Sequence, residues 1–263
     1  MAILEDLGDQ LSFYARAIAW IPRTLRRYRT EIARLLAEVA FGSGALVVIL
    51  GTAGVMLSLS LFVGSLVGLQ GFRALDSLGV QALTGFITAY FNTRDIAPLV
   101  ASAALTATLG AGFTAQLGAM RISEEVDALE VMAVPSVPFL VTTRVIAGVI
   151  AIIPMYTIGL LASFAAARLN VTLLNGLPGG TYDHYFGLFL PVSDILFSYL
   201  KVIAFALVII LIHCHYGYAT GGPAGVGVAV GRAVRLSIVA AAVLDFFLTL
   251  VIYGTDTSVR VAG

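Results

Sequence analysis

Long stretches without a charged residue dominate the pattern of this chain. Three of them lie between Glu38 and Arg73, between Asp95 and Arg121, and between Arg144 and Arg168. Because a helix needs about 20 apolar residues to cross a bilayer, each stretch predicts one membrane span. A fourth span is predicted from the region of Asp194 and Lys201 to about His213, and a fifth covers roughly residues 236–253. The pattern therefore predicts an all-α integral membrane fold with five spans.

The segment before the first span has a helical period of its own. Apolar residues recur at three- and four-residue steps, at Ile21, Leu25, Tyr28, Ile32, Leu35 and Val39. Arginines cover the remaining surface, and Pro22 suits a first helical turn, where its missing N–H costs nothing. This pattern is typical of a helix that lies in the membrane interface and is attracted to anionic lipid. We assign residues 1–40 to such interfacial helices, with a coiled-coil or partner-docking helix as the alternative.

The distribution of basic residues indicates the orientation. Short cytoplasmic flanks are enriched in Lys and Arg. With the N-terminus inside, ten basic residues lie on the cytoplasmic side and five on the other, namely Arg73, Arg94, Arg168, Lys201 and Arg260. We therefore predict a multi-pass protein of the cytoplasmic (inner) membrane with its N-terminus inside, which places residues 120–135 in the cytoplasm.

Residues 120–135 contain an unusual concentration of acids for a chain that is only 11% charged. Four acids fall within seven residues, at Glu124, Glu125, Asp127 and Glu130. Ser123 is a suitable N-cap, and carboxylates in a first turn favour the helix dipole. With Pro135 and Pro138 as stop signals, the sequence predicts a short helix from about Glu124 to Ala133.

A helix of this length is marginal unless it docks onto something. Val126, Leu129 and Ala133 form a narrow apolar stripe, and Glu124, Asp127 and Glu130 occupy the adjoining arc. This combination indicates a protein-binding face. The alternative is a solvated turn whose acids serve only solubility.

The chain lacks the sequence signatures of several kinds of activity. Net charge is zero, which argues against a nucleic-acid binder. The P-loop pattern G-x-x-x-x-G-K-[ST] and the zinc-protease pattern H-E-x-x-H do not occur. His213 and His215 are two residues apart, and side chains at this spacing on a helix do not face each other. The two imidazoles could not easily reach one ion, so we predict no metal site. We expect no enzyme activity in this chain and no cofactor.

Asp245 stands out because it falls inside the fifth predicted span. An ionisable group within a membrane helix marks a functional or partnered residue. Two interpretations are open, a lipid- or proton-handling acid and a structural acid bonded to a neighbouring helix.

Three blocks resemble the MlaE/YrbE family of ABC-transporter permeases. Residues 98–144, "PLVASAALTATLGAGFTAQLGAMRISEEVDALEVMAVPSVPFLVTTR", resemble the family's signature block. Residues 61–72, "LFVGSLVGLQGF", resemble its glycine-rich stretch, and residues 244–254, "LDFFLTLVIYG", resemble its last span with an embedded Asp. The resemblance assigns residues 41–263 to a permease domain. Thr142-Thr-Arg144 and Glu125 resemble the actinobacterial YrbE branch.

The resemblance implies partners and site residues. Members pair as dimers, bind cytoplasmic ABC ATPase subunits and sit beneath MCE-domain proteins that form a lipid tunnel. In the actinobacterial branch the second YrbE chain is usually a paralogue, as part of an Mce complex. The resemblance implies an ATPase-coupling helix with Glu124, Glu125, Asp127, Ala128, Leu129 and Glu130. It also implies a lipid pathway with Leu61, Leu69 and Phe72, with Arg94 and Asp95 near it or near the MCE contact.

The resemblance thus predicts a permease subunit that couples ATP hydrolysis by a partner to the movement of a hydrophobic lipid. Phospholipid, fatty or mycolic acid and sterol all fit an apolar cavity. A secondary transporter or channel that uses Asp245 and a purely structural membrane anchor are the alternatives.

Overall fold

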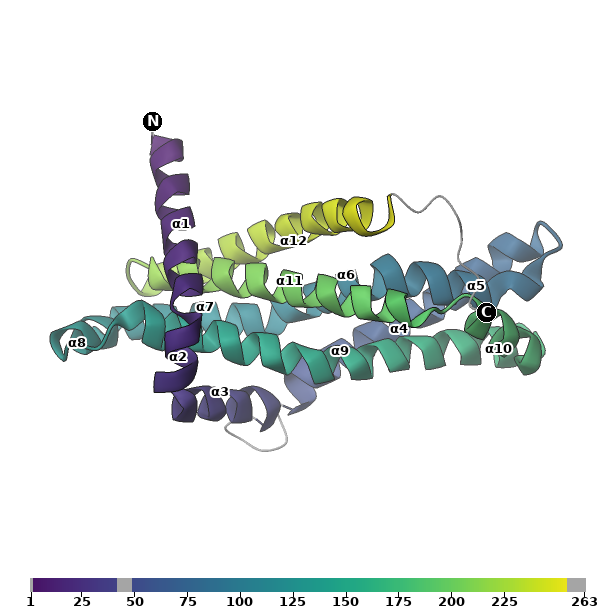
Figure 1. Cartoon of the computed structure of the whole chain (residues 1–263), viewed down its shortest axis with the longest axis horizontal. Coiled ribbons are helices and arrows are strands. Elements are labelled where there is room, and N and C mark those ends of the chain that lie inside the picture. The colour runs from purple at the N-terminus through teal and green to yellow at the C-terminus, as the bar shows by residue number, and fades with distance from the viewer. Residues whose placement is uncertain (1, 42–48, 255–263) are drawn as a thin grey trace. The chain divides into compact units, whose positions relative to one another are not determined.

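The computed structural model describes residues 2–41 and 49–254, and every regular element within them is helical. Five helical segments are long and apolar enough to cross a membrane, namely Thr52–Asp76, Gln81–Ile122, Val137–Leu174, Val192–Tyr218 and Pro223–Tyr253. Figure 1 labels the helices along the chain. The prediction of an all-α fold with five spans is confirmed. Arg260 and the side chain of Val39 lie outside the described residues.

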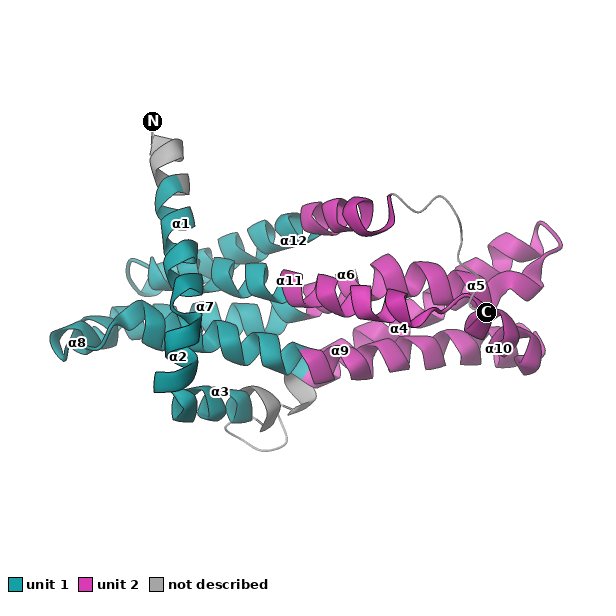
Figure 2. Cartoon of the chain, viewed as in Figure 1, with its two compact units in different colours: residues 1–52, 105–152, 205–241 teal, residues 53–104, 153–204, 242–263 magenta. Residues whose placement is uncertain are grey.

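The chain divides into two compact units, which Figure 2 distinguishes by colour. Unit 1 takes residues 1–52, 105–152 and 205–241, and unit 2 takes residues 53–104, 153–204 and 242–263. The divisions fall inside helices, so several spans contribute one part of their length to each unit.

Unit 1 begins with three helices, α1 (Ala2–Ala19), α2 (Ile21–Arg27) and α3 (Arg29–Phe41). Pro22 lies in the first turn of α2, as predicted. The predicted apolar stripe is divided between α2 and α3, because the backbone at Tyr28 leaves the helical region with φ −115° and ψ 36°. Ile32 and Leu35 of α3 are buried, whereas Leu25 of α2 is exposed.

The N-terminal helices pack against the start of the third span. That span consists of the π-helical segment η4 (Val137–Thr142) followed by α9 (Thr143–Leu169) and the π-helical segment η5 (Asn170–Leu174). The Thr142 hydroxyl donates a hydrogen bond to the Ala17 carbonyl over 3.0 Å. The ring of Tyr28 meets that of Phe139 edge-on, with the centroids 5.2 Å apart. Part of the N-terminal apolar face is therefore used within the chain.

The rest of unit 1 is formed by the end of the second span and by parts of the last two. The π-helical segment η3 (Thr106–Gly110) continues into α7 (Ala111–Ile122), and a short helix α8 (Glu125–Val131) follows. The last two spans are α11 (Val192–Tyr218) and α12 (Pro223–Tyr253).

In unit 2 the second span differs from its prediction. Its described helix runs through η1 (Gln81–Leu83), α5 (Thr84–Ile87), the π-helical segment η2 (Thr88–Ile96) and α6 (Ala97–Leu105). Arg94 and Asp95 therefore lie inside this helix instead of at its outer end. The second span was predicted to begin after Asp95 because a charged residue was taken as the boundary of a span. A charge inside a span is tolerated, however, where a partner within the protein contacts it.

Unit 2 also contains a helix between the third and fourth spans that the sequence reading missed, α10 (Gly179–Leu188). Tyr182 of α10 packs with Val171 and Leu177, and Phe72 packs against this cluster from α4 (Ile49–Asp76). Burial raises the pKa of the Tyr182 phenol to about 12. The hydrogen bonds that Arg168 donates to the Asp183 carboxylate lower the pKa of that acid.

Within unit 2, α4 and α9 approach each other through glycines. A Cβ atom placed on Gly64 would lie 2.3 Å from the Ser163 carbonyl oxygen, and one on Gly68 would lie 2.8 Å from that of Ala167. Gly54, on the same helix, has no such neighbour within 4 Å. Small residues let membrane helices approach each other closely, and Gly64 and Gly68 form such a contact with the α9 backbone.

We expect Gly64→Ala to lower the free energy of unfolding by about 1–3 kcal/mol, because the new methyl group must displace backbone. Gly54→Ala is the matched control and should be neutral or slightly stabilising, since alanine favours the helix. Thermal unfolding of the purified variants in detergent measures both. Equal stability of the two variants would refute the close α4–α9 contact.

Candidate functional site

The acidic helix α8 lies in unit 1 between the second and third spans. The structure corrects its predicted N-cap, because Ser123 ends α7 and its hydroxyl donates to the Ala119 carbonyl over 3.1 Å. Glu124 takes the N-cap position in the left-handed region, with φ 61°. The connection between α7 and α8 is short, because only Ser123 and Glu124 lie between the two helices.

The C-terminal end of α8 is also earlier than predicted. The helix ends at Val131, and Ala133 adopts a left-handed conformation with φ 56°. The Val134 N–H donates to the Leu129 carbonyl and the Ala133 N–H to that of Glu130, which is the Schellman pattern. This turn, which precedes Pro135, ends the helix, and Pro138 lies in the first turn of the next span.

Both non-glycine residues with positive φ in the described part of the chain flank α8. Left-handed backbone costs a residue with a Cβ roughly 1–2 kcal/mol. Such outliers persist where the surrounding structure determines them, and they gather at functional sites.

The surface of α8 is divided into a docked side and an open side. Val126 is fully buried and Leu129 is half-buried, which confirms part of the predicted stripe. Glu124, Glu125, Asp127 and Ala128 are exposed. Beyond them, Val131 is 89% and Met132 65% exposed, so the open side has an apolar tip next to its acids.

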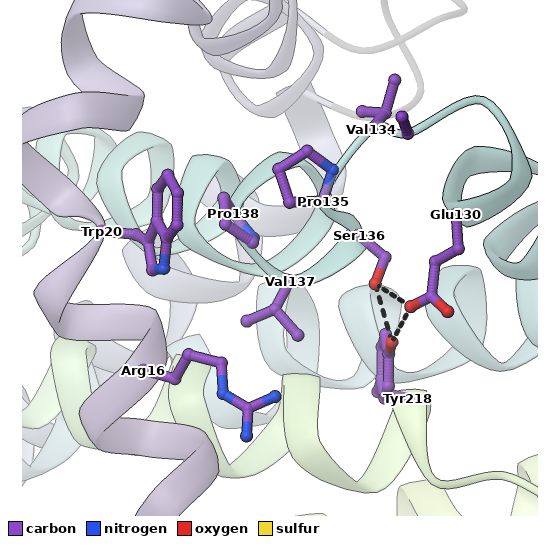
Figure 3. A pocket seen from close by; sticks show the side chains of 10 residues that line it. Arg16, Trp20, Glu130, Val134, Pro135, Ser136, Val137, Pro138 and Tyr218 are labelled. Carbon is purple, nitrogen blue, oxygen red and sulfur yellow. Dashed lines mark hydrogen bonds between the residues drawn. The ribbon is translucent and has the colours of Figure 1, made fainter.

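Three polar contacts tie α8 to the ends of three spans. Asp127 forms an ion pair with Arg121 at the end of α7. Glu130 Oε1 accepts hydrogen bonds from Ser136 Oγ at 2.7 Å and from the Tyr218 hydroxyl at 3.4 Å. Ser136 directly precedes η4, and Tyr218 is the last residue of α11 (Figure 3). Glu130 is therefore an anchor, which its spacing in the sequence did not indicate.

Beside this anchor lies a pocket of about 450 Å³, shown in Figure 3. Its walls come from α1, α8, the turn after α8 and the end of α11. It is lined by Arg16, Trp20, Glu130, Ala133, Val134, Pro135, Ser136, Val137, Pro138 and Tyr218. We call it the α1–α8 pocket.

In unit 2, Lys201 forms the centre of a buried charged cluster. Its side chain is 0% exposed, and its ammonium donates to Asp95 Oδ1 at 2.9 Å and to Thr249 Oγ1 at 2.9 Å. Asp245 Oδ1 lies 2.6 Å from the same nitrogen as an ion pair without hydrogen-bond geometry. Asp245 is thus partnered, which fits the structural interpretation of this acid.

A helix irregularity supplies another oxygen to Lys201. Proline has no N–H to give to the carbonyl four residues before it, and the carbonyl four residues before Pro98 is that of Arg94. Lys201 Nζ donates to this Arg94 oxygen over 2.6 Å. π-Helical turns such as η2 are frequent at functional sites.

The Arg94 side chain has its own partners. Its Nε donates to Asp194 Oδ2 over 2.7 Å, and its guanidinium lies 3.7 Å from the ring centre of Tyr90 and 4.2 Å from that of Tyr253. Asp95 is the most accessible acid of the cluster, with its side chain 35% exposed. The sequence patterns pointed to Arg94, Asp95 and Asp245 but not to Lys201, although a lone lysine inside a span was a usable signal.

The residues expected to contact lipid have different surroundings. Leu61 lines an apolar cavity of about 330 Å³ in unit 2, with Ser65, Ala166, Leu169, Asn170, Leu173 and Leu174. Leu69 is half-buried, and Phe72 packs in the cluster with Tyr182. A lipid-contact role for the three residues stays a prediction.

The two histidines of α11 face different surroundings. His213 is fully buried, with Nδ1 2.7 Å from the Thr114 hydroxyl, whereas the ring of His215 meets that of Phe13 at 5.2 Å. Among the described residues no group of three His, Cys, Asp or Glu side chains is placed to hold a metal ion.

Comparison with known families identifies the chain. The family model described as "Permease MlaE" matches residues 41–251. The chain belongs to the MlaE permease family. Together with its five membrane-crossing helices, this makes it a multi-pass membrane protein, and the resemblance seen in residues 98–144 is confirmed.

Relatives of this MlaE family member are found in plants and bacteria. TRIGALACTOSYLDIACYLGLYCEROL 1, chloroplastic, of Arabidopsis thaliana is 30% identical over 208 residues, which cover 74% of this chain but only 56% of the plant protein. A probable ABC transporter permease protein of Synechocystis is 28% identical, over 75% of this chain and 76% of that protein. The intermembrane phospholipid transport system permease protein MlaE of Haemophilus influenzae is 26% identical, over 78% and 80% respectively.

Because Ala133 occupies a left-handed position, we expect Ala133→Gly to stabilise the end of α8 by about 1 kcal/mol. Ala128→Gly, in the exposed middle of the same helix, should destabilise it by a similar amount. Hydrogen exchange of the amides of residues 123–135 measures both effects. Faster exchange in Ala133→Gly than in the unmodified protein would contradict the Schellman turn.

Removal of Lys201 should be strongly destabilising, because Asp95 and Asp245 would lose their shared cation. We expect Lys201→Met to lower the free energy of unfolding by about 3–5 kcal/mol. Lys201→Met combined with Asp245→Asn should recover part of this loss, since one carboxylate is then neutral. Thermal unfolding in detergent measures both variants, and a double variant less stable than Lys201→Met would contradict the pairing.

Proposed function

We propose that this chain is the membrane-spanning permease subunit of an ABC-type transporter that moves a hydrophobic lipid. ATP hydrolysis is performed by a separate ATPase subunit, since this sequence has no P-loop. The observation that carries the proposal is α8, an exposed acidic helix anchored to the ends of three spans. The family match and the names of the bacterial relatives support it.

The open side of α8 has the composition of a docking surface. Glu124 and Glu125 carry charges without an ion-pair partner among the described residues, and Val131 and Met132 form the exposed apolar tip. Interfaces combine an apolar anchor with a polar rim. We propose that a groove on the ATPase, with basic residues at its rim, receives this tip.

The contacts on the anchored side of α8 would transmit a movement of the ATPase to the membrane spans. A displacement of the helix acts on α7 through Arg121–Asp127, and on the third and fourth spans through Glu130. Closure of the ATPase would thus move the span ends together.

The remaining partners and the orientation belong to the same proposal. A second permease chain, identical or paralogous, would complete the translocation path, and an MCE-domain protein would receive or deliver the lipid. The count of basic residues supports an N-terminus on the cytoplasmic side of the inner membrane. The apolar cavity at Leu61 is suited to an acyl chain, and the name of the Haemophilus relative favours phospholipid as the lipid.

The contacts of Asp245 bear on the alternative of secondary transport. An acid that binds and releases a coupling ion must exchange its partner, and Asp245 instead lies 2.6 Å from the buried Lys201. The secondary-transport reading predicts transport driven by an ion gradient without ATP, abolished by Asp245→Asn with ATPase binding intact. A structural anchor would assemble the complex without substrate-dependent ATPase stimulation.

The decisive experiment alters the open side of α8 and leaves its anchors in place. We expect the double variant Glu124→Lys/Glu125→Lys to lose co-purification with the ATPase at least tenfold and to lose lipid transport in proportion. Like charges would then face the basic rim of the groove. Pull-down of the co-expressed complex and lipid transfer in proteoliposomes are the measurements.

Asp76→Lys serves as the matched control, because Asp76 is an exposed acid at the end of α4 in unit 2. It should leave both readouts unchanged. If the double variant binds the ATPase and transports lipid as well as the unmodified chain, the coupling proposal fails.

A further inference from the structure

We propose that the α1–α8 pocket binds the headgroup of a zwitterionic phospholipid with a primary ammonium, a phosphoethanolamine. The site lies in unit 1, whereas the apolar cavity at Leu61 lies in unit 2, and the inference does not depend on the coupling proposal. The pocket combines one cation, one carboxylate and an indole ring within about 450 Å³, a volume in the range of small-molecule sites.

The cationic end of the site is Arg16. Figure 3 shows its side chain leaving α1 and passing beneath Val137. Among the described residues no acid lies within ion-pair distance of it, and unlike the other arginines without an ion pair it lines this pocket. A guanidinium without a carboxylate partner is suited to a phosphate, which it binds through two parallel N–H donors.

The acidic end is Glu130. Its Oε1 accepts from Ser136 and Tyr218, which fixes the carboxylate beside the pocket, while Oε2 accepts no hydrogen bond from the described residues. An anionic headgroup would be repelled by this carboxylate, whereas an ammonium would pair with it. Arg16 and Glu130 together therefore complement a headgroup that carries both charges.

The apolar part of the pocket fits the interfacial region of a lipid. Val134, Pro135, Val137 and Pro138 form one side, and Trp20 lies on the other (Figure 3). Tryptophan favours the level of the headgroups because its ring is amphipathic. The backbone of α1 is held beside the pocket by the Thr142–Ala17 hydrogen bond.

Bound lipid would connect the N-terminal helices to α8. Arg16 and Trp20 belong to α1 and its end, whereas Glu130 and Ala133 belong to α8 and its terminal turn. A headgroup that bridges Arg16 and Glu130 would restrain α8 in its docked position. The membrane's headgroup composition would thus influence the mobility of this helix.

Trp20 makes the test direct, because it is the only tryptophan of the chain. The full-length chain is placed in phosphatidylcholine nanodiscs that contain equal mole fractions of acyl-brominated phosphatidylethanolamine, phosphatidylglycerol or phosphatidylcholine, one at a time. Bromine quenches a nearby indole, so quenching of Trp20 reports occupancy. We expect the strongest quenching from the ethanolamine lipid.

Variants of Arg16 and Glu130 test which residue binds the phosphate and which binds the ammonium of the headgroup. We expect Arg16→Gln to weaken the apparent affinity for the ethanolamine lipid about tenfold, as for the loss of one charge-assisted hydrogen bond, and Arg16→Lys to retain part of it. Glu130→Gln should remove the preference for ethanolamine over glycerol headgroups. Arg26→Gln and Asp76→Asn remove the same charges from exposed positions outside the pocket and should change neither.

Four results would overturn the proposal. Equal quenching by the three headgroups would place Trp20 merely in the interface, and strongest quenching by phosphatidylglycerol would indicate diffuse attraction to the arginines. Equal effects of the pocket variants and their controls would exclude the α1–α8 pocket. A change in Trp20 emission that requires the ATPase, without headgroup preference, would assign the pocket to a protein partner.

Discussion

The structure depends on one constraint, that a charge buried within a membrane helix must meet its partner inside the protein. Lys201, the only lysine of the chain, is fully buried and contacts oxygens from two other spans. The same constraint accounts for the path of the second span, since Arg94 and Asp95 can remain within the helix only because Asp194, Lys201 and two tyrosine rings meet them. The charges that interrupt the apolar pattern therefore hold the spans of unit 2 together.

Unit 1 uses its charges differently. Four of its acids lie on α8 or at its N-cap, where Asp127 and Glu130 fasten the helix and Glu124 and Glu125 remain exposed. One short helix can thus be held firmly on one side and offer a surface on the other. Such a division suits the coupling role that we propose for α8 in this member of the MlaE family. The α1–α8 pocket lies beside the fastening and brings the N-terminal helices into contact with it.

Helix irregularities occur at the positions where these contacts form. Pro98 has no N–H for the Arg94 carbonyl, to which Lys201 donates instead. Glu124 and Ala133 adopt left-handed backbone conformations at the two ends of α8. Gly64 and Gly68 let α4 approach the backbone of α9 more closely than any other residue would allow. The Arg94 carbonyl is satisfied by a tertiary contact, whereas the left-handed residue Ala133 closes a local turn.

The sequence by itself determined the all-α class, the five spans and the position of the acidic helix, because apolar length and helical period are local properties. It also singled out Asp245 and the residues 98–144 that carry the family resemblance. Only the tertiary structure decided that Asp245 pairs with Lys201, that Glu130 is an anchor, and that Gly64 faces the α9 backbone whereas Gly54 has no such neighbour. The physical reason is that the partner of a charge or of a glycine lies on another helix, and its identity depends on where two helices cross.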